Sequence, residues 1–446
     1  MLKKVFSKIT GKMTRTEKSG VINMCIKPIS MVLSLAHTPL MLAYLGDEKY
    51  GVWATLLSIV NWINYFDVGI GNGLRQILPR QLAEKDYGDA RRSISTAYTV
   101  LTLISVAIYI VLLLSVLLFD WKNVFSTTVE VSPVLCICFT YICINFVLSL
   151  VRTIHYSLQR SERNAIRGVI SQVITVAGMF VLTLSGSGSL VAVALVHGGA
   201  SLLVNIADSI DMFSKNKELC PSVKYFDKSK LTIIGGVGVK YLVIQLMCLV
   251  LFTTDNLLIS NLFGSAAVTP FSIANRVFEI AYSMLAAFLI PYWSRSTVAF
   301  QQGDIDWIKN SYRKTMLLCL LFCAGYLVMV PLFKPVVGLW MGRQLAFEPG
   351  LPMLMAVFYG LYSIMAVQCQ FINGSGKINV QMIMYVVIGA ANIPLSIFLG
   401  KTMGLGAFGI RLATAILVLI EIVVLAINFR CIVRNAECDA HLAEGQ

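Results

Sequence analysis

The apolar run VLTLISVAIYIVLLLSVLLF, residues Val100–Phe119, decides the fold class because it carries no charged side chain. A helix that crosses the hydrocarbon core of a bilayer needs roughly 20 predominantly apolar residues. A second predominantly apolar run lies at Leu412–Phe429, and similar runs fill most of the chain. The pattern predicts an all-α integral membrane protein.

Composition supports this prediction. The 446 residues are 57% hydrophobic and only 13% charged, whereas soluble domains carry about 25% charged residues. The longest polar stretch lies around Asp211–Leu231, which leaves no room for a soluble domain of ordinary size. The net charge of +13 would suggest a nucleic-acid partner in a soluble protein. Here the placement of basic loops explains most of it, so no nucleic-acid partner is expected.

Hydrophobicity predicts about twelve transmembrane helices in two six-helix lobes. The expected helices are 21–45, 51–78, 93–119, 131–158, 165–185, 188–211, 232–262, 267–294, 307–333, 351–372, 378–400 and 404–430. The domain organisation that follows is a basic cytoplasmic tail at 1–20, an N-terminal lobe at 21–211, a cytoplasmic linker at 212–231, a C-terminal lobe at 232–430 and a cytoplasmic tail at 431–446.

Lys and Arg alternate between the loops, which predicts the orientation. Basic residues concentrate at 3–18, 80–92, 160–163, 215–230 and 295–314. The intervening loops hold only Lys49, only Lys122, or none, although the alternation weakens after residue 334. Positive loops stay on the cytoplasmic side, so both termini are expected in the cytoplasm. The start of the chain indicates no cleavable signal peptide, and the 11 cysteines are expected to be free thiols in packed helices.

The two halves repeat each other weakly. Leu45-Gly46 ends the first helix and Phe263-Gly264 ends the seventh, an offset of 264 − 46 = 218 residues. Six helices per half make the repeats parallel, and transporters of this kind bind their substrate between the halves. The repeat therefore favours a transporter, with a channel or receptor of duplicated origin as the other interpretation.

Polar residues share one face of the first helix, at spacings of four, three, four and three residues. They are Asn23, Lys27, Ser30, Ser34 and His37. Ionisable groups inside spans usually face a cavity or a partner. The alternative is a helix-packing face, with Lys27 reaching the cytoplasmic interface and His37 neutral.

Later helices carry matching stripes. In the second helix Asn61, Asn64, Asn72 and Arg75 share a face with Asp67 at its margin, and in the eighth helix Ser272, Arg276, Glu279 and Ser283 do so. The 218-residue shift maps Asn61 onto Glu279 and His37 onto Asp255. A shared central cavity accounts for these matches. The other interpretation of Arg276 and Glu279 is that they pair only with each other.

The basic residues within spans suit an anionic substrate, because Arg and Lys are natural partners of phosphate. The candidate substrate-binding residues are Lys27, Arg276, Arg75 and Lys240, and Arg411 adds further positive charge. The candidates for coupling to H⁺ or Na⁺ are Asp67, Asp255, Glu279 and His37. A charge that moves across the membrane couples to voltage by about 2.3 kcal/mol per 100 mV.

Two glycine-rich segments, Gly69–Gly73 and Gly235–Gly238, are interpreted as helix-packing or flexible points. Neither completes the G-x-x-x-x-G-K-[ST] phosphate loop. No nucleotide-binding cassette, catalytic triad or metal-ligand spacing is evident, so neither an enzyme nor a bound cofactor is expected.

Several motifs resemble those of a known family. Tyr44-Leu45-Gly46, Tyr50–Trp53 and Asp67–Leu74 resemble the first helical pair of bacterial polysaccharide-repeat flippases, of which the O-antigen flippases are one group. Thr254–Ile259 with Phe263-Gly264 is similar to their seventh helix, and Asn373–Gly376 to their tenth-to-eleventh connection. These proteins belong to the multidrug/oligosaccharidyl-lipid/polysaccharide exporter superfamily.

The resemblance implies a MATE-like fold with two six-helix lobes. It implies movement of undecaprenyl-pyrophosphate-linked oligosaccharide from the inner to the outer leaflet of the bacterial inner membrane, through a basic cavity and driven by a cation gradient. The implied partners are the lipid-linked oligosaccharide, membrane lipids and a polysaccharide polymerase complex.

The chain departs from the drug exporters of this superfamily, which often carry an Asp in the first helix, because its own first helix has Lys27 and His37 and no carboxylate. A cation-coupled drug efflux antiporter stays as the rival function. A non-transporting scaffold of a glycan-assembly complex is the third.

Overall fold

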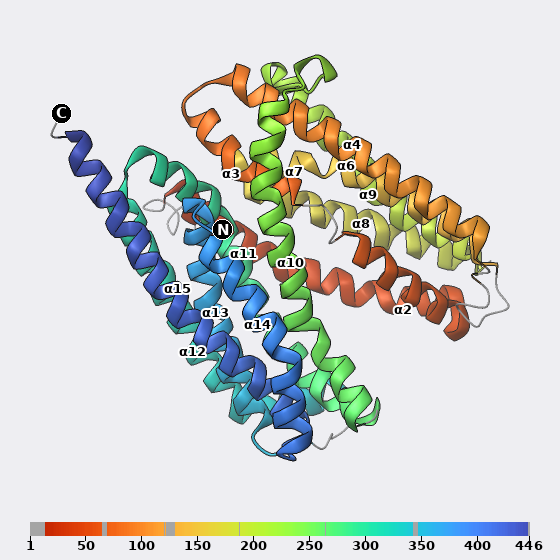
Figure 1. Ribbon diagram of the computed structural model, residues 1–446. Coiled ribbons are helices and arrows are strands. Elements are labelled where there is room, and N and C mark those ends of the chain that lie inside the picture. Colours follow the sequence, from red (N-terminus) through yellow and green to blue (C-terminus); the bar gives the residue numbers. More distant parts are fainter. Residues whose placement is uncertain are drawn as a thin grey trace, which may run out of the picture. The chain divides into compact units, whose positions relative to one another are not determined.

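The computed structural model is built of helices (Figure 1). It describes residues 14–64, 69–119, 121, 130–186, 188–263, 265–341 and 347–444, and these ranges contain no β-strand. The all-α prediction is therefore confirmed. The chain divides into two compact units, which are treated separately below.

The N-terminal unit comprises residues 25–242. Its elements are α2 (Arg15–Asn64, from residue 25 on), α3 (Ile70–Ala83), α4 (Tyr87–Leu118), α6 (Ser132–Leu148), α7 (Leu150–Ser157), α8 (Ser161–Ser185), α9 (Leu190–Lys215), the short helices η1 (Lys217–Leu219) and η2 (Val223–Tyr225), and the start of α10 (Lys228–Phe263). One apolar cluster surrounds Trp53 and Phe139, and another surrounds Leu74 and Leu78. These clusters join α4, α6 and α9, which run side by side in Figure 1.

The C-terminal unit comprises residues 1–24 and 243–446. After the second part of α10 it contains α11 (Ser265–Gln302), α12 (Ile305–Met341), α13 (Leu351–Ser375), α14 (Asn379–Ile397), the π-helical turn η3 (Phe398–Thr402) and α15 (Gly406–Glu444). Helix α13 packs against α11, α12 and α15. It is the most buried of the candidate spans in this unit, so α13 forms the centre of the unit.

Ten helices of the described chain are long and apolar enough to cross a membrane. They coincide with the last ten of the twelve predicted spans, from Tyr87–Leu118 to Gly406–Cys438. The first two predicted spans, 21–45 and 51–78, fall on α2 and α3. The protein is therefore a multi-pass membrane protein.

The expected helix at 51–78 differs from the structure. Helix α2 runs on from the first expected helix through a kink at Gly46 (φ 71°) and ends at Asn64, and a separate helix α3 begins at Ile70. Gly69, just before α3, has a left-handed backbone (φ 69°). Glycine enters this conformation at little cost because it has no Cβ, so a new helix can start directly after Gly69.

The two glycine-rich segments pack against each other inside the N-terminal unit. A Cβ placed on Gly73 would lie 2.3 Å from the carbonyl oxygen of Ile234, and one on Gly69 would meet the backbone of Gly238. Helices α3 and α10 thus approach with their backbones nearly in contact. Gly69, Gly73 and Gly238 are therefore packing glycines, whereas a Cβ on Gly235 or Gly236 would meet nothing within 4 Å.

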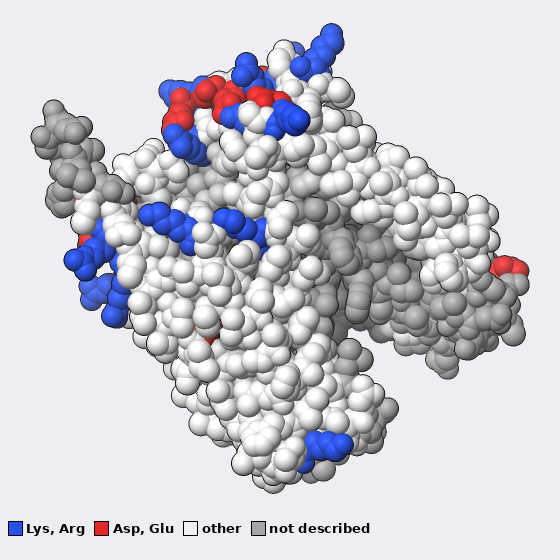
Figure 2. Space-filling model, in the orientation of Figure 1, with Lys and Arg blue, Asp and Glu red and all other residues white. Residues whose placement is uncertain are grey.

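The connection from α9 to α10 folds onto the start of α4. Arg91 donates to the carbonyl of Cys220 over 2.8 Å, and Lys230 pairs with Asp89 at 2.6 Å. At the start of α10, hydrogen bonds from the hydroxyl and backbone N–H of Ser229 hold the pKa of the Asp227 carboxyl below its usual range. Residues 212–231, expected to link the lobes, thus lie within the N-terminal unit. Their charged side chains appear at the top of Figure 2.

Candidate functional site

A polar cavity of about 520 Å³ opens within the N-terminal unit. Helices α6, α7, α8 and α9 contribute its walls. The polar side chains that define it include Asn145, Arg152, Asn164, Arg167, Asn205 and Asp208. All of these residues lie in predicted spans or at their ends. The membrane part of the unit therefore contains a hydrophilic hollow.

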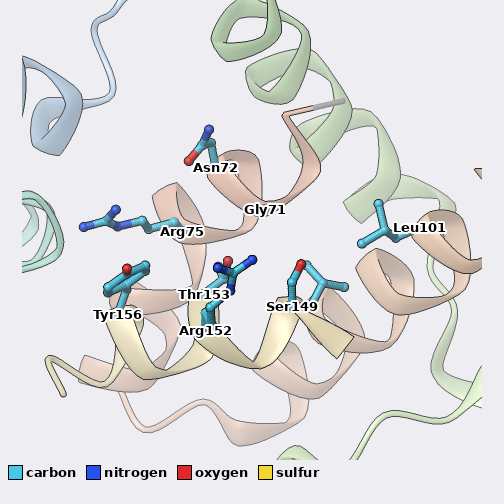
Figure 3. Close-up of a pocket in the computed structure, with 9 residues that line it drawn as sticks. Gly71, Asn72, Arg75, Leu101, Ser149, Arg152, Thr153 and Tyr156 are labelled. Atoms are coloured by element: carbon cyan, nitrogen blue, oxygen red, sulfur yellow. The ribbon is translucent and has the colours of Figure 1, made fainter. Parts of the chain in front are cut away.

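A second hollow of about 150 Å³ shares Ser149 and Arg152 with the first. Arg75 and Asn72 of α3 and Tyr156 of α7 complete its wall (Figure 3). The guanidinium of Arg75 lies over the Tyr156 ring, 4.3 Å from its centroid, in a cation–π contact. The two hollows together are called the arginine cavity, after Arg75, Arg152 and Arg167.

Arg152 forms no ion pair with any carboxylate among the described residues. Its side chain is exposed, and no carboxylate of the described chain lies within ion-pair distance of it. Its backbone is anchored, because the Asn164 amide donates to the Arg152 carbonyl over 3.0 Å. The Arg152 side chain lines the cavity and is available to an anion from outside the chain.

Arg167, in contrast, belongs to a network of charges. It forms ion pairs with Asp208 and Asp211. His155 is fully buried, and its Nε2 lies 2.8 Å from Asp208 Oδ1 and 2.6 Å from Arg167 Nη1. One imidazole nitrogen cannot donate to Asp208 and accept from Arg167 at once, so the tautomer decides which of the two bonds exists. In either case the carboxylates largely neutralise Arg167.

The rest of the wall supplies neutral hydrogen-bonding groups. Asn205 donates to the side-chain oxygen of Asn145 over 2.7 Å, and Ser171 and Ser201 also line the cavity. The lining of the two hollows thus includes three arginines and one carboxylate, Asp208. Guanidinium forks match phosphate oxygens geometrically, and amides and hydroxyls suit hydroxyl-rich ligands. The cavity fits an anionic, hydrophilic group.

The predicted basic residues fall in different places. Arg75 lies in the arginine cavity. Lys27 on α2 and Lys240 on α10 are partly exposed elsewhere in the N-terminal unit. Arg276 lies on α11 of the C-terminal unit and pairs with Glu279 at 3.3 Å, with both side chains exposed. The pairing along the helix, one of the two interpretations of these residues, is therefore present.

The predicted coupling residues are also dispersed. Asp67 lies outside the described residues. His37 packs in the N-terminal unit, with its ring centroid 5.9 Å from that of His197, which in turn meets Trp53 edge-on. Ser30, on the same predicted polar face, donates to Gln172 over 2.8 Å. At these two positions the face of the first helix is used for helix packing.

Asp255 is buried in the C-terminal unit and forms an ion pair with Arg411 at 3.3 Å. Thr414 donates to the same carboxylate, and Arg411 also donates to Asn275 over 2.8 Å. The Arg411 guanidinium lies between the rings of Phe271 and Phe358, at 4.9 and 4.3 Å from their centroids. Any coupling ion at Asp255 would have to compete with this guanidinium.

Sequence reasoning missed Arg152, Arg167 and Asp208. The rule that ionisable groups inside spans mark functional sites applies to each of them, because all three lie in predicted helices. Their assembly depends on the packing of α7, α8 and α9, which periodicity along one helix does not show. In the described part of the chain, no cluster of three His, Cys, Asp or Glu side chains could hold a metal.

Comparison with known proteins gives one family and one fold. The family model described as "Polysaccharide biosynthesis protein" matches residues 17–297. A multidrug resistance MATE family transporter of the MOP superfamily, in an outward-facing structure, is 14% identical with a TM-score of 0.78, covering 95% of this chain and 97% of that one.

Two further structures agree. A MOP superfamily transporter from Pyrococcus furiosus is 14% identical with a TM-score of 0.77, over 95% of this chain and 97% of that one. A Vibrio cholerae MATE transporter, VcmN in its bent form, is 14% identical with a TM-score of 0.73, over 96% of this chain and 99% of that one. No curated protein matches the sequence. The predicted MATE-like fold is confirmed.

Proposed function

Because the chain belongs to the polysaccharide biosynthesis protein family, we propose that it is a flippase for undecaprenyl-pyrophosphate-linked oligosaccharide, the repeat unit of an O-antigen or another surface polysaccharide. It moves this lipid from the inner to the outer leaflet of the bacterial inner membrane. It acts as a transporter and not as an enzyme, and a polysaccharide polymerase complex is its proposed partner downstream.

The observation that carries this proposal is the arginine cavity. A pyrophosphate group needs cationic donors that are not already paired, and Arg152 meets this condition among the described residues. Charge-assisted hydrogen bonds are roughly twice as strong as neutral ones. The amides and hydroxyls of Asn145, Asn205 and Ser201 supply contacts for sugar hydroxyls on the same wall.

The membrane orientation proposed from the sequence indicates on which side of the membrane the arginine cavity lies. The charged connections at 80–92, 160–163 and 215–230 belong to the N-terminal unit, and positive loops remain in the cytoplasm. The network of Arg163, Arg167 and Lys215 with Asp211 joins two of these connections near the cavity. We therefore assign the arginine cavity to the cytoplasmic half of the unit, where the pyrophosphate of a lipid in the inner leaflet would enter.

The transport cycle proposed is alternating access driven by a cation gradient. Arg75 acts in the arginine cavity, and Lys27, Lys240 and Arg276 are proposed contacts along the substrate path. Asp67, Asp255, Glu279 and His37 remain the proposed residues for H⁺ or Na⁺ coupling. The rival, efflux of small cationic drugs, predicts a more acidic cavity than the one formed by Arg75, Arg152 and Arg167.

The experiment that tests the function is the leaflet location of the lipid-linked oligosaccharide in cells of the native host that lack this protein. Accumulation on the cytoplasmic leaflet is expected, and the wild-type chain should reverse it while Arg152→Ala and Lys27→Ala should not. Normal delivery of the lipid-linked oligosaccharide to the outer leaflet, in a host without a redundant flippase, would contradict the proposal. Drug efflux would then be the favoured function.

A further inference from the structure

Glu421 is a buried carboxyl group of the C-terminal unit. It lies on α15, its exposed fraction is 0%, and neither of its carboxyl oxygens has a hydrogen-bond partner in the described chain. Helix α15 packs against α13 and α14. Glu421 is not among the residues proposed above for substrate or ion binding.

The surroundings of Glu421 supply no positive charge. The titratable side chains near enough for its charge to act on them are Cys248 of α10, Cys369 of α13 and Tyr385 of α14. Each of these is neutral when protonated, and among the described residues neither α11 nor α12 adds a basic partner to Glu421. Asp255 in the same unit differs, because the guanidinium of Arg411 balances its charge.

An ionised carboxylate in such a place is strongly disfavoured. Removing a single charge from water costs several kcal/mol even after the protein relaxes, and buried groups respond by becoming neutral. Glu421 has neither an ion-pair partner nor a hydrogen-bond donor within the described chain to offset this cost. The carboxyl is therefore protonated in this conformation.

We propose that Glu421 is a proton-binding site of the C-terminal unit, which holds its proton while helices α13, α14 and α15 enclose it and releases it when the transport cycle admits water. The proton leaves the carboxyl oxygen to water, and the carboxylate is reprotonated from the opposite side in the return step. The inference rests on the proposed transport function, and it assigns the coupling ion as H⁺.

A structural role alone would leave Glu421 permanently protonated. Coupling requires that the proton be exchanged, and exchange requires that water reach the carboxyl in another conformation. Burial would then couple proton release to the conformational change, because the proton can leave Glu421 only when the helices separate. The distinguishing observable is the protonation state of this one side chain through the cycle.

The first test uses infrared difference spectroscopy on the full chain in lipid nanodiscs, with undecaprenyl pyrophosphate as the added ligand. The wild type should show the C=O stretching band of a protonated buried carboxyl, and this band should change when ligand is added at alkaline pH. Glu421→Gln should lack the band. The control Glu84→Gln, which alters an exposed carboxyl directly after α3, should keep it.

The second test measures proton flux into vesicles that contain the reconstituted protein, undecaprenyl pyrophosphate and a trapped pH-sensitive dye. The wild type should pass protons under an imposed pH gradient, and Glu421→Gln should fall to the level of protein-free vesicles with an unchanged unfolding midpoint. A band that persists in Glu421→Gln, a band that ignores ligand and pH, or wild-type flux in this variant would each overturn the proposal.

The two tests separate this inference from the flippase proposal. If no lipid-linked oligosaccharide is moved in cells but the carboxyl band disappears in Glu421→Gln and proton flux is lost, Glu421 stands as the proton site and only the substrate is wrong. If the oligosaccharide is moved normally by Glu421→Gln, the flippase assignment stands and Glu421 is not the coupling site.

Discussion

The carboxylate of Asp255 lies 3.3 Å from the guanidinium of Arg411, and both side chains are almost completely buried in the C-terminal unit. Asn275 extends this pair, because it accepts from Arg411 over 2.8 Å and from the Tyr359 hydroxyl over 3.0 Å. The pair therefore links α10, α11, α13 and α15. Its first role is to hold these helices in register, whatever part it has in ion coupling.

Breaking this pair from the acidic side should destabilise the protein. Asp255→Ala leaves the Arg411 guanidinium buried without its carboxylate, a change that costs about 3–5 kcal/mol. This destabilisation would appear as a lower midpoint of thermal unfolding in detergent, measured by tryptophan fluorescence. The double variant Asp255→Ala/Arg411→Leu should recover part of the loss, because no charge is then left unpaired. Wild-type stability of Asp255→Ala would contradict the pair's structural role.

Arg152→Ala should weaken the binding of undecaprenyl pyrophosphate without affecting the fold. Hydrogen bonds to charged groups contribute about 1.5–3 kcal/mol, and each 1.4 kcal/mol is about tenfold in affinity, so a loss of roughly 10- to 150-fold is expected. Binding to the purified protein can be followed by microscale thermophoresis. Arg80→Ala, which removes an exposed arginine paired with Glu84, is the matched control. Equal affinities in the two variants would remove the arginine cavity from the substrate path.

Gly73→Ala should destabilise the N-terminal unit. The added Cβ would lie 2.3 Å from the carbonyl oxygen of Ile234, and forcing extra volume into packed helices costs about 1–3 kcal/mol. Gly236→Ala is the matched control, because its Cβ meets nothing within 4 Å. That control should unfold at the wild-type temperature or slightly above, since alanine favours a helix by about 1 kcal/mol over glycine. Identical midpoints for both variants would refute the close contact of α3 and α10.

Arg276→Ala and Lys27→Ala should abolish transport while membrane insertion and stability stay normal. The Arg276–Glu279 pair has side chains that are 60% and 46% exposed, and pairs of this kind contribute about 0–1 kcal/mol to stability. Loss of oligosaccharide delivery therefore reports on the substrate path. Delivery is measured by surface polysaccharide in the complemented host, with protein level checked by immunoblot. Delivery of the oligosaccharide at the wild-type level by both variants would contradict the assignment of Arg276 and Lys27 to the substrate path.

Much of the fold was predictable because the membrane imposes a local rule. Whether a segment can span depends on its own length and hydrophobicity, and this holds for Val100–Phe119 without knowledge of any neighbour. The same logic located the last ten predicted spans. The rule failed at Gly69, where a left-handed residue precedes a new helix inside the span predicted at 51–78.

The sequence by itself determined the class of protein, the spans and the excess of positive charge, since each is a property of short segments. Only the tertiary structure brought Arg75, Arg152 and Arg167 around one cavity and left Arg152 without a carboxylate partner in the described chain. It also paired Asp255 with Arg411 and enclosed Glu421. These relationships join residues on different helices, and helix periodicity shows which face of a helix is polar but not which partner it meets.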